Sequence, residues 1–335
     1  MRKLNKKIVC LGGGTGVSVV LSGLKKYPLD LTAIVTMFDS GGSSGKLRKE
    51  LGIPPLGDVR QCLLALSEKN NLTDLFHYRF GKGTLKGHNF GNLLIAAAIG
   101  VTGSLDKAIK KISKILDIKG QVIPVTSEKS DIVALLKNNK KIKEEEEIIN
   151  CPQISKIGVK KLFLEPKVQA NPKTISAIRN ADLIIIAPGK FYTTILPIFL
   201  VRGISEAVRK SLAKKVFVCN LMTQIGNTDG FSVEDFITIL EKYLGKNVIN
   251  YVIFNTGKLS TKQTKEVRKV FPRANFIKYD KSLLKNKNFI GTDIIDHRIH
   301  KLNPADILVK KANRRTIVLH DSGKLAKIII SLLRK

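Results

Sequence analysis

The sequence of 335 residues contains no tryptophan, only 11 prolines and only four cysteines, and it has no long apolar run. The cysteines are too far apart for a metal-binding or redox motif, and scattered thiols are typical of a reducing compartment. The apolar run near the N-terminus is too short for the core of a signal peptide. The most apolar stretch, residues 183–201, is broken by prolines, a glycine and a lysine. We therefore expect a cytoplasmic protein with no membrane insertion.

Acidic side chains are also scarce, because 27 Asp and Glu stand against 58 Lys and Arg, for a formal net charge of +31 at pH 7. Such a charge suits nucleic acid, an anionic membrane surface or a phosphorylated small molecule. Most of the basic residues are Lys spread along the chain, and no stripe of Arg alternates with aromatic residues as in nucleic-acid grooves. We expect no nucleic-acid partner, and the simplest interpretation is a solvated, lysine-rich surface.

Short apolar runs alternate with amphipathic segments along most of the chain. We expect strands at 7–11, 31–38, 183–187, 216–219, 251–255 and 316–320, and helices at 17–26, 58–69 and 89–100. Such alternation predicts an α/β fold with a Rossmann-like, mainly parallel, doubly wound sheet covered on both faces.

One segment, residues 121–168, departs from this alternation. Short β-like pieces surround a charged stretch there, and we expect a small β-rich insertion within a single domain that spans residues 1–335. The run from Glu144 to Glu147 is interpreted as a solvated turn or edge.

The strongest local signal is the loop Gly12-Gly13-Gly14-Thr15-Gly16, between the first predicted strand and the first predicted helix. Glycines there let the backbone approach a ligand, and the free N–H groups of a helix N-terminus bind phosphate. The dinucleotide fingerprint fails, because Val19 stands where the third glycine is required. The loop alone indicates a nucleotide or another anion.

The second predicted strand leads into residues 39–48, with the sequence DSGGSSGKLR. This is no P-loop, because only three residues separate Gly41 from Gly45, and Leu47 stands where Ser or Thr would bind magnesium. Consecutive Gly and Ser residues can still form a nest of N–H groups for an anion. Asp39 is suited to accept hydrogen bonds from a ribose or to hold a metal. The alternative is an ordinary flexible loop.

Two further polar loops follow strands, at 188–194 and 220–227, and two helix starts, at 54–60 and 87–92, add ionisable groups. Ligands of open parallel sheets bind outside the carboxyl ends of the strands, so these loops point to one crevice. Asp58 is interpreted either as the N-cap of its helix or as a site residue. The pair His297 and His300 is more typical of a surface than of a metal site.

Six blocks in this order resemble the 2-phospho-L-lactate transferase (CofD) family and, more closely, its bacterial gluconeogenesis-factor branch. The blocks are LGGGTG at 11–16, DSGGSSGKLR at 39–48, PPLGDVR at 54–60, GHNFGNLLIAA at 87–97, APGKFYTTILP at 187–197 and CNLMTQ at 219–224. The resemblance covers nearly the whole chain and implies a Rossmann-like fold with its site at the strand carboxyl ends.

For function, the resemblance implies two alternatives. Members of the gluconeogenesis-factor branch look like binders of UDP-sugars such as UDP-N-acetylglucosamine, needed for cell shape and cell-wall precursor supply during growth on gluconeogenic carbon sources. The transferase branch moves a phospholactyl group from a nucleotide-linked donor with Mg²⁺. The chain departs from the family pattern at Ser40, where many members carry a second Asp, and at Lys190-Phe191, where Ser-Leu is commoner. The loss of that acid weakens a two-carboxylate metal site.

We expect a nucleotide or nucleotide-sugar partner and a homo-oligomer. The sequence itself implies no cofactor, although the transferase alternative would bring in Mg²⁺. The catalytic candidates, should a reaction take place, are Asp39 and Asp58. The residues expected to contact the ligand are Gly12, Gly13, Gly14, Thr15, Gly16, Asp39, Ser40, Gly41, Gly42, Ser43, Ser44, Lys46, Gly57, Asp58, Arg60, His88, Asn89, Asn92, Pro188, Gly189, Tyr192, Thr193, Asn220, Thr223 and Gln224.

Overall fold

A seven-stranded parallel sheet forms the centre of the computed structural model, which describes residues 6–68, 71–273, 275–298, 300, 305, 308 and 317–334. The strand order is β10-β9-β8-β7-β1-β2-β3, and every neighbouring pair is parallel. The strands are β1 (Lys7–Gly12), β2 (Asp30–Val35), β3 (Gln121–Pro124), β7 (Leu183–Ile186), β8 (Lys214–Val218), β9 (Tyr251–Asn255) and β10 (Phe289–Thr292). The predicted doubly wound α/β fold is confirmed.

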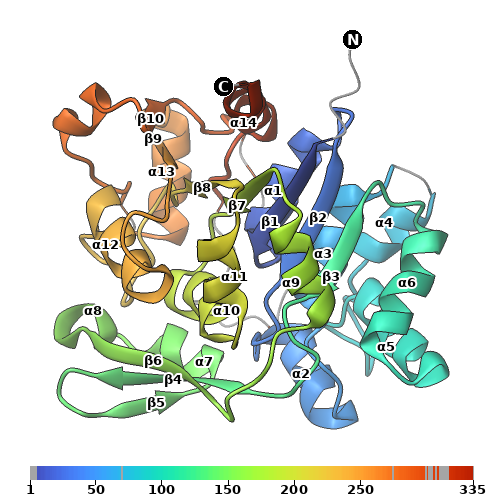
Figure 1. Ribbon diagram of the computed structural model, residues 1–335. Helices are drawn as coiled ribbons and strands as arrows, with labels where there is room; N and C mark the ends of the chain where they lie inside the picture. The colour runs from blue at the N-terminus through green and yellow to red at the C-terminus, as the bar shows by residue number, and fades with distance from the viewer. Residues whose placement is uncertain are drawn as a thin grey trace.

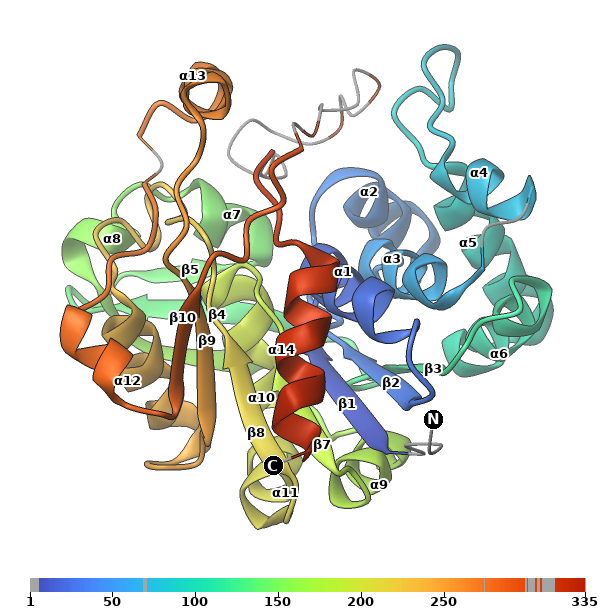
Figure 2. The same cartoon turned by 90° about the horizontal axis from the view of Figure 1, so that it is seen from above.

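Helices cover both faces of this sheet, so its central strands are buried throughout. Strand β7 reads LIII and is buried at all four positions, because apolar side chains there face a helix layer on either side. Figures 1 and 2 show α1 (Gly14–Leu24), α3 (Gly57–Leu66) and α14 (Ser322–Arg334) on one face. The other face carries α9 (Pro172–Arg179), α10 (Leu196–Leu200), α11 (Ile204–Lys210) and α12 (Val233–Leu244).

The winding of the sheet reverses between β1 and β7. From β1 the chain moves outward through β2 to β3, and after the insertion it returns to β7 and moves the opposite way through β8 and β9 to β10. The loops after β1 and β7 therefore diverge to opposite faces and leave a crevice at their carboxyl ends.

A second, antiparallel sheet in the order β5-β4-β6 lies below the main sheet in Figure 1. It consists of β4 (Asp131–Leu136), β5 (Lys141–Lys143) and β6 (Val159–Glu165), with α7 (Glu145–Asn150) and α8 (Ile154–Ile157) between β5 and β6. The β-rich insertion is thus present, but β3 at the start of the expected segment pairs with β2. Strand β3 lies at the edge of the main sheet, and an edge strand tolerates a proline such as Pro124.

Two predicted elements differ in the structure. The loop at 39–48 is mostly helix α2 (Gly42–Leu51), since Gly41 and Gly42 provide only the turn into it. For the strand expected at 316–320, Thr316 lies outside the described residues, and 317–320 form only an isolated bridge between Ile295 and His320. The edge strand next to β9 is β10 instead. The remaining elements are α4 (Asn71–His77), α5 (Phe90–Thr102), α6 (Leu105–Ile115), η1 (Phe191–Ile195), α13 (Thr261–Val270) and η2 (Lys281–Lys285).

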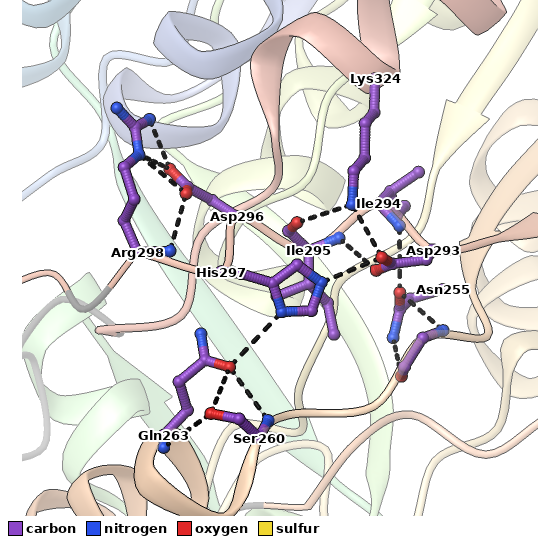
Figure 3. Close-up of polar contacts among 11 residues, drawn as sticks. Asn255, Ser260, Gln263, Asp293, Ile294, Ile295, Asp296, His297, Arg298 and Lys324 are labelled. Carbon is purple, nitrogen blue, oxygen red and sulfur yellow. Dashed lines mark hydrogen bonds and ion pairs between the residues drawn. The ribbon is translucent and has the colours of Figure 1, made fainter.

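The segment after β10 is held by two carboxylates (Figure 3). Asp293 accepts hydrogen bonds from Lys324 Nζ at 2.7 Å and His297 Nε2 at 2.9 Å, and Asp296 binds Arg298 and His300. Partial burial opposes ionisation, yet the bonds from Lys324 and His297 lower the pKa of Asp293 to about 2. The two histidines bind different carboxylates, and no group of three or more metal-ligating side chains occurs in the described part of the chain.

Within the described ranges, no helix is long and apolar enough to cross a membrane.

The first turn of α1 packs closely against the loop after β7, and Gly16→Ala tests this contact. An added Cβ would lie 1.7 Å from the carbonyl oxygen of Pro188, so one of the two segments must move. We expect the free energy of unfolding in urea to fall by roughly 3 kcal/mol. The matched control is Gly100→Ala in α5, where no heavy atom lies within 4 Å of the added Cβ. This control should gain about 0.5–1 kcal/mol. Equal stability of Gly16→Ala and wild type would contradict the close approach.

Candidate functional site

A cavity of about 550 Å³ lies at the carboxyl ends of the strands, at the reversal between β1 and β7. Its volume is in the range of small-molecule binding sites. Nineteen of the expected contact residues line it, from loops that are far apart in the sequence. They are Gly13, Gly14, Thr15, Gly16, Asp39, Gly41, Gly42, Ser43, Ser44, Gly57, Asp58, Arg60, Asn92, Pro188, Gly189, Thr193, Asn220, Thr223 and Gln224.

Six expected residues are absent from the lining: Gly12, Ser40, Lys46, His88, Asn89 and Tyr192. Lys46 is directed toward Glu50, with Nζ 3.8 Å from Oε1. Tyr192 packs edge to face against Phe191, which places it in an aromatic cluster. The Lys46 charge therefore does not belong to the anion loop as expected, because the helical form of α2 turns this side chain outward.

Three helices begin at the cavity without a side-chain cap. The N-cap residues of α1, α2 and α3 are Gly13, Gly41 and Leu56, and none of them provides a side-chain hydrogen bond to the first turn. The first N–H groups of a helix have no partner within it, and the helix dipole adds partial positive charge at that end. Three such ends at one cavity make a strong cradle for an anion such as a diphosphate.

Of the two interpretations of Asp58, the N-cap is wrong, because Asp58 stands in the first turn of α3, one residue after Gly57. The error has a simple origin, since Leu56 occupies the cap position without a capping side chain. A Cβ added to Gly13 or Gly14 would lie 2.7 Å from a carboxylate oxygen of Asp58. The carboxylate thus packs directly against the glycine turn after β1, at the wall of the cavity.

A buried hydrogen-bond network joins α2, α3 and α5. Arg60 Nε donates to Asn92 Oδ1 at 2.9 Å, and Asn92 Nδ2 donates to Ser43 Oγ at 3.3 Å. Ser43 Oγ is also 3.2 Å from His88 Nδ1. Burial, together with the charge of Lys46, lowers the pKa of His88. His88 and Asn89, which caps α5, therefore support the helix starts from behind, whereas Arg60 and Asn92 reach the cavity itself.

Asn220 and Gly189 tie two of the strand-end loops together. The amide of Asn220 accepts from Gly189 N at 2.9 Å and donates to Gly189 O at 2.8 Å. Both hydrogen-bonding groups of this backbone unit are thus fixed by one side chain. Asn220 lines the cavity, yet its amide holds the loop after β7 in position.

Two acidic side chains, the half-buried Asp39 and the buried Glu145, lie next to this loop together with Lys190. Glu145 is 3% exposed, its Oε1 is 2.8 Å from Lys190 Nζ, and its Oε2 accepts from Ser40 N at 3.0 Å. Burial and the nearby charges of Glu145 and Asp58 raise the pKa of Asp39 well above its usual range. Burial opposes ionisation of Glu145 as well, but Lys190 holds the pKa of that carboxyl below its usual value. Protonation of this pair is therefore favoured on Asp39 over Glu145.

Glu145 was not expected in the site, because its acidic run was interpreted as a solvated turn or edge. The signal that was overlooked is spacing, because Glu145 precedes Ile148 and Ile149 by three and four residues and so shares their buried helix face. Ser40 fixes this face, since its hydroxyl accepts from Glu146 N at 3.0 Å. The small insertion thus contributes a carboxylate to the cavity.

The cavity lining also includes apolar side chains, none of which was expected. Met222 and Phe271 line the cavity, together with Leu319 and His320 from the chain just before α14. His320 Nε2 donates to the carbonyl oxygen of Cys219 at 3.0 Å, and burial lowers the pKa of His320 to about 4. The ring is therefore neutral. Apolar lining residues look like core residues in a sequence, so no local signal marks them.

Comparison with known proteins identifies relatives along nearly the whole chain. The sequence profile of the family described as 2-phospho-L-lactate transferase CofD matches residues 8–297. The gluconeogenesis factor of Bacillus subtilis is 38% identical over 334 residues, which is 98% of this chain and 98% of that protein. The gluconeogenesis factor of Halalkalibacterium halodurans is 42% identical over 258 residues, which is 76% of this chain and 79% of that protein.

The fold is shared with a solved structure. A crystal structure of a Bacillus halodurans protein superposes with a TM-score of 0.85 at 35% sequence identity, covering 97% of this chain and 99% of that one.

The state of Asp39 predicts an unusual effect of Asp39→Asn. The unfolded chain ionises Asp39 above its ordinary pKa of 3.8, whereas the folded protein keeps this proton to higher pH, so wild-type stability falls as pH rises toward the raised pKa. Asn cannot ionise and keeps an oxygen for the Gly41 N–H, which Asp39 Oδ1 accepts at 3.1 Å. In urea unfolding, Asp39→Asn should therefore be more stable than wild type near neutral pH, and the difference should shrink as pH falls toward about 4. A variant less stable than wild type at neutral pH would mean that Asp39 is ionised in the folded protein.

Proposed function

The chain belongs to the 2-phospho-L-lactate transferase CofD family and, within it, to the gluconeogenesis factors, and from this we propose that its cavity binds a nucleotide sugar such as UDP-N-acetylglucosamine. We further propose that it acts in the cytoplasm as a regulator of cell shape and cell-wall precursor supply during growth on gluconeogenic carbon sources.

One observation supports this ligand above others: the cavity lining combines two chemically distinct sets of groups, helix starts and apolar side chains. The uncapped starts of α1, α2 and α3 suit the diphosphate of a nucleotide sugar. The apolar lining residues include Phe271, whose ring is suited to stack on the base. A simple anion would make no contact with the apolar lining residues, and a purely apolar ligand would leave the N–H groups of the helix starts without hydrogen-bond acceptors.

The second candidate is a transferase acting on a nucleotide-linked donor. It is favoured by one feature, the carboxylate of Asp58 against the glycine turn at the anion cradle. Group transfer at phosphorus requires stabilisation of charge that develops on phosphoryl oxygens, together with a positioned acceptor. In this alternative Asp58 orients the acceptor.

Calorimetric titration tests the ligand class. UDP-N-acetylglucosamine should bind, and GDP and dinucleotides should bind more weakly. Phe271→Ala should weaken UDP-N-acetylglucosamine by about 1–3 kcal/mol, the usual range for base stacking. Inorganic pyrophosphate, which lacks a base, serves as the control ligand and should bind wild type and Phe271→Ala equally. Equal loss for both ligands would mean that Phe271 supports the fold rather than the base, and no binding of any nucleotide would overturn the proposal.

Incubation with UDP-N-acetylglucosamine separates regulator from enzyme. A regulator should leave the nucleotide sugar intact through hours with stoichiometric protein and Mg²⁺, while ligand at a hundredfold excess over Kd stabilises the fold by about 2.7 kcal/mol. Chromatography of the nucleotides and thermal unfolding provide the two readouts. Turnover that disappears in Asp58→Asn, with the fold intact, would establish the transferase instead.

A further inference from the structure

The anion cradle, which is the part of the cavity at the starts of α1, α2 and α3, also contains three acidic side chains. Asp39, Asp58 and Glu145 all line the cavity, close to the helix starts that suit a diphosphate. Ionised carboxylates repel phosphate oxygens, and many phosphate sites solve this with Mg²⁺ held between the two. A binding site with this composition therefore needs its own source of positive charge.

Lys190 provides such a charge from within the chain. Its ammonium lies 2.8 Å from Glu145 Oε1, and about a third of its side chain (35%) remains exposed and lines the cavity. The backbone beside it is fixed, because Asn220 binds both the N–H and the carbonyl group of Gly189. The lysine is thus held at the border between the acidic groups and the space for the ligand.

The same residues do not fit Mg²⁺. This ion requires near-octahedral oxygen ligands at about 2.0–2.1 Å. Both oxygens of Glu145 are already used, one by the ammonium of Lys190 and one by the N–H of Ser40, and Asp39 Oδ1 accepts from Gly41 N. Throughout the residues that the structure describes, no cluster of three or more acidic, His or Cys side chains is arranged to hold a metal.

The charges are then balanced without a metal. Glu145 accepts from Lys190, and burial together with the charges of Glu145 and Asp58 raises the pKa of Asp39 above its usual range, which reduces the negative charge beside the ligand space. The guanidinium groups of Arg60 and Arg79 also line the cavity, but they already donate to oxygens of Asn92, Phe76 and Gly87. Asp58 is the third carboxyl, and it lies at the positive end of α3 against the glycine turn.

We propose that Lys190 is the built-in cation of this cradle and that the chain binds the diphosphate of its ligand without a divalent metal. The inference rests on the proposed nucleotide-sugar function and goes further. It names the residue whose positive charge balances the phosphates, and it predicts that binding does not depend on a metal.

The test is calorimetric titration of the full chain with UDP-N-acetylglucosamine and with pyrophosphate, first in excess EDTA and then in excess Mg²⁺. Wild-type affinity for the nucleotide sugar should agree between the two conditions within about twofold. Lys190→Ser should lose about tenfold or more in EDTA and regain affinity in Mg²⁺, since removal of the ammonium frees Glu145 for a cation. Lys190→Arg should keep metal-independent binding.

Two controls keep the test decisive. Lys173→Ser removes a lysine that also lies 2.8 Å from a carboxylate, Asp106, but on the exposed surface, and it should leave both titrations unchanged. If Lys190→Ser fails to fold because Glu145 is left without its counter-ion, the double variant Lys190→Ser/Glu145→Gln removes the pair together. The double variant should fold and bind pyrophosphate more weakly than wild type in EDTA.

The outcomes separate the two proposals. Wild-type binding only in the presence of Mg²⁺, or full affinity in EDTA of the folded variants that carry Lys190→Ser, would overturn the role of Lys190 and leave the nucleotide-sugar function standing. Absence of binding under every condition would overturn the proposed function itself.

Discussion

The contact between the turn after β1 and the loop after β7 is the constraint on which the site depends. These strands are neighbours in the sheet but lead to opposite faces, so their loops must separate within a few residues. Only a glycine at position 16 lets the first helix begin beside the carbonyl of Pro188. Once this approach is fixed, the start of α1 and Lys190 line the same cavity.

Much of this architecture could be predicted from the sequence, because buried parallel strands have a strong signature. The run LIII of β7 and the glycines after β1 predicted the sheet and the edge of it at which a ligand is expected. The weak points were the short edge strands β3 and β10, which lack continuous apolar runs. Glu145 was missed because its role depends on a long-range bond to Ser40, and Phe271 because an apolar site residue resembles a core residue. Whether the nineteen lining residues contact a ligand remains a prediction.

The electrostatics of the cavity contrast with those of the whole chain. The sequence carries a formal net charge of +31, yet the wall of the cavity gathers Asp39, Asp58 and Glu145. The bulk charge of the chain is therefore a poor guide to its site. The cradle offers an anion three helix N-termini, the two guanidinium groups of Arg60 and Arg79, and the ammonium of Lys190 at defined positions. Specificity in such a site comes from geometry, whereas the surface lysines contribute a diffuse field that salt screens.

The two hydrogen bonds between Ser40 and the start of α7 also bear on how the chain can be shortened. The antiparallel sheet looks like a separate appendage in Figure 1, and its chain enters and leaves the main fold in one stretch. Excision of that stretch would nevertheless remove Glu145, strip Lys190 of its counter-ion and leave the backbone of Ser40 without its acceptor. A minimal fragment designed around the main sheet alone would thus lose one wall of the cavity. An exchange of this antiparallel sheet between homologues would likewise have to supply an acidic residue that can pair with Lys190.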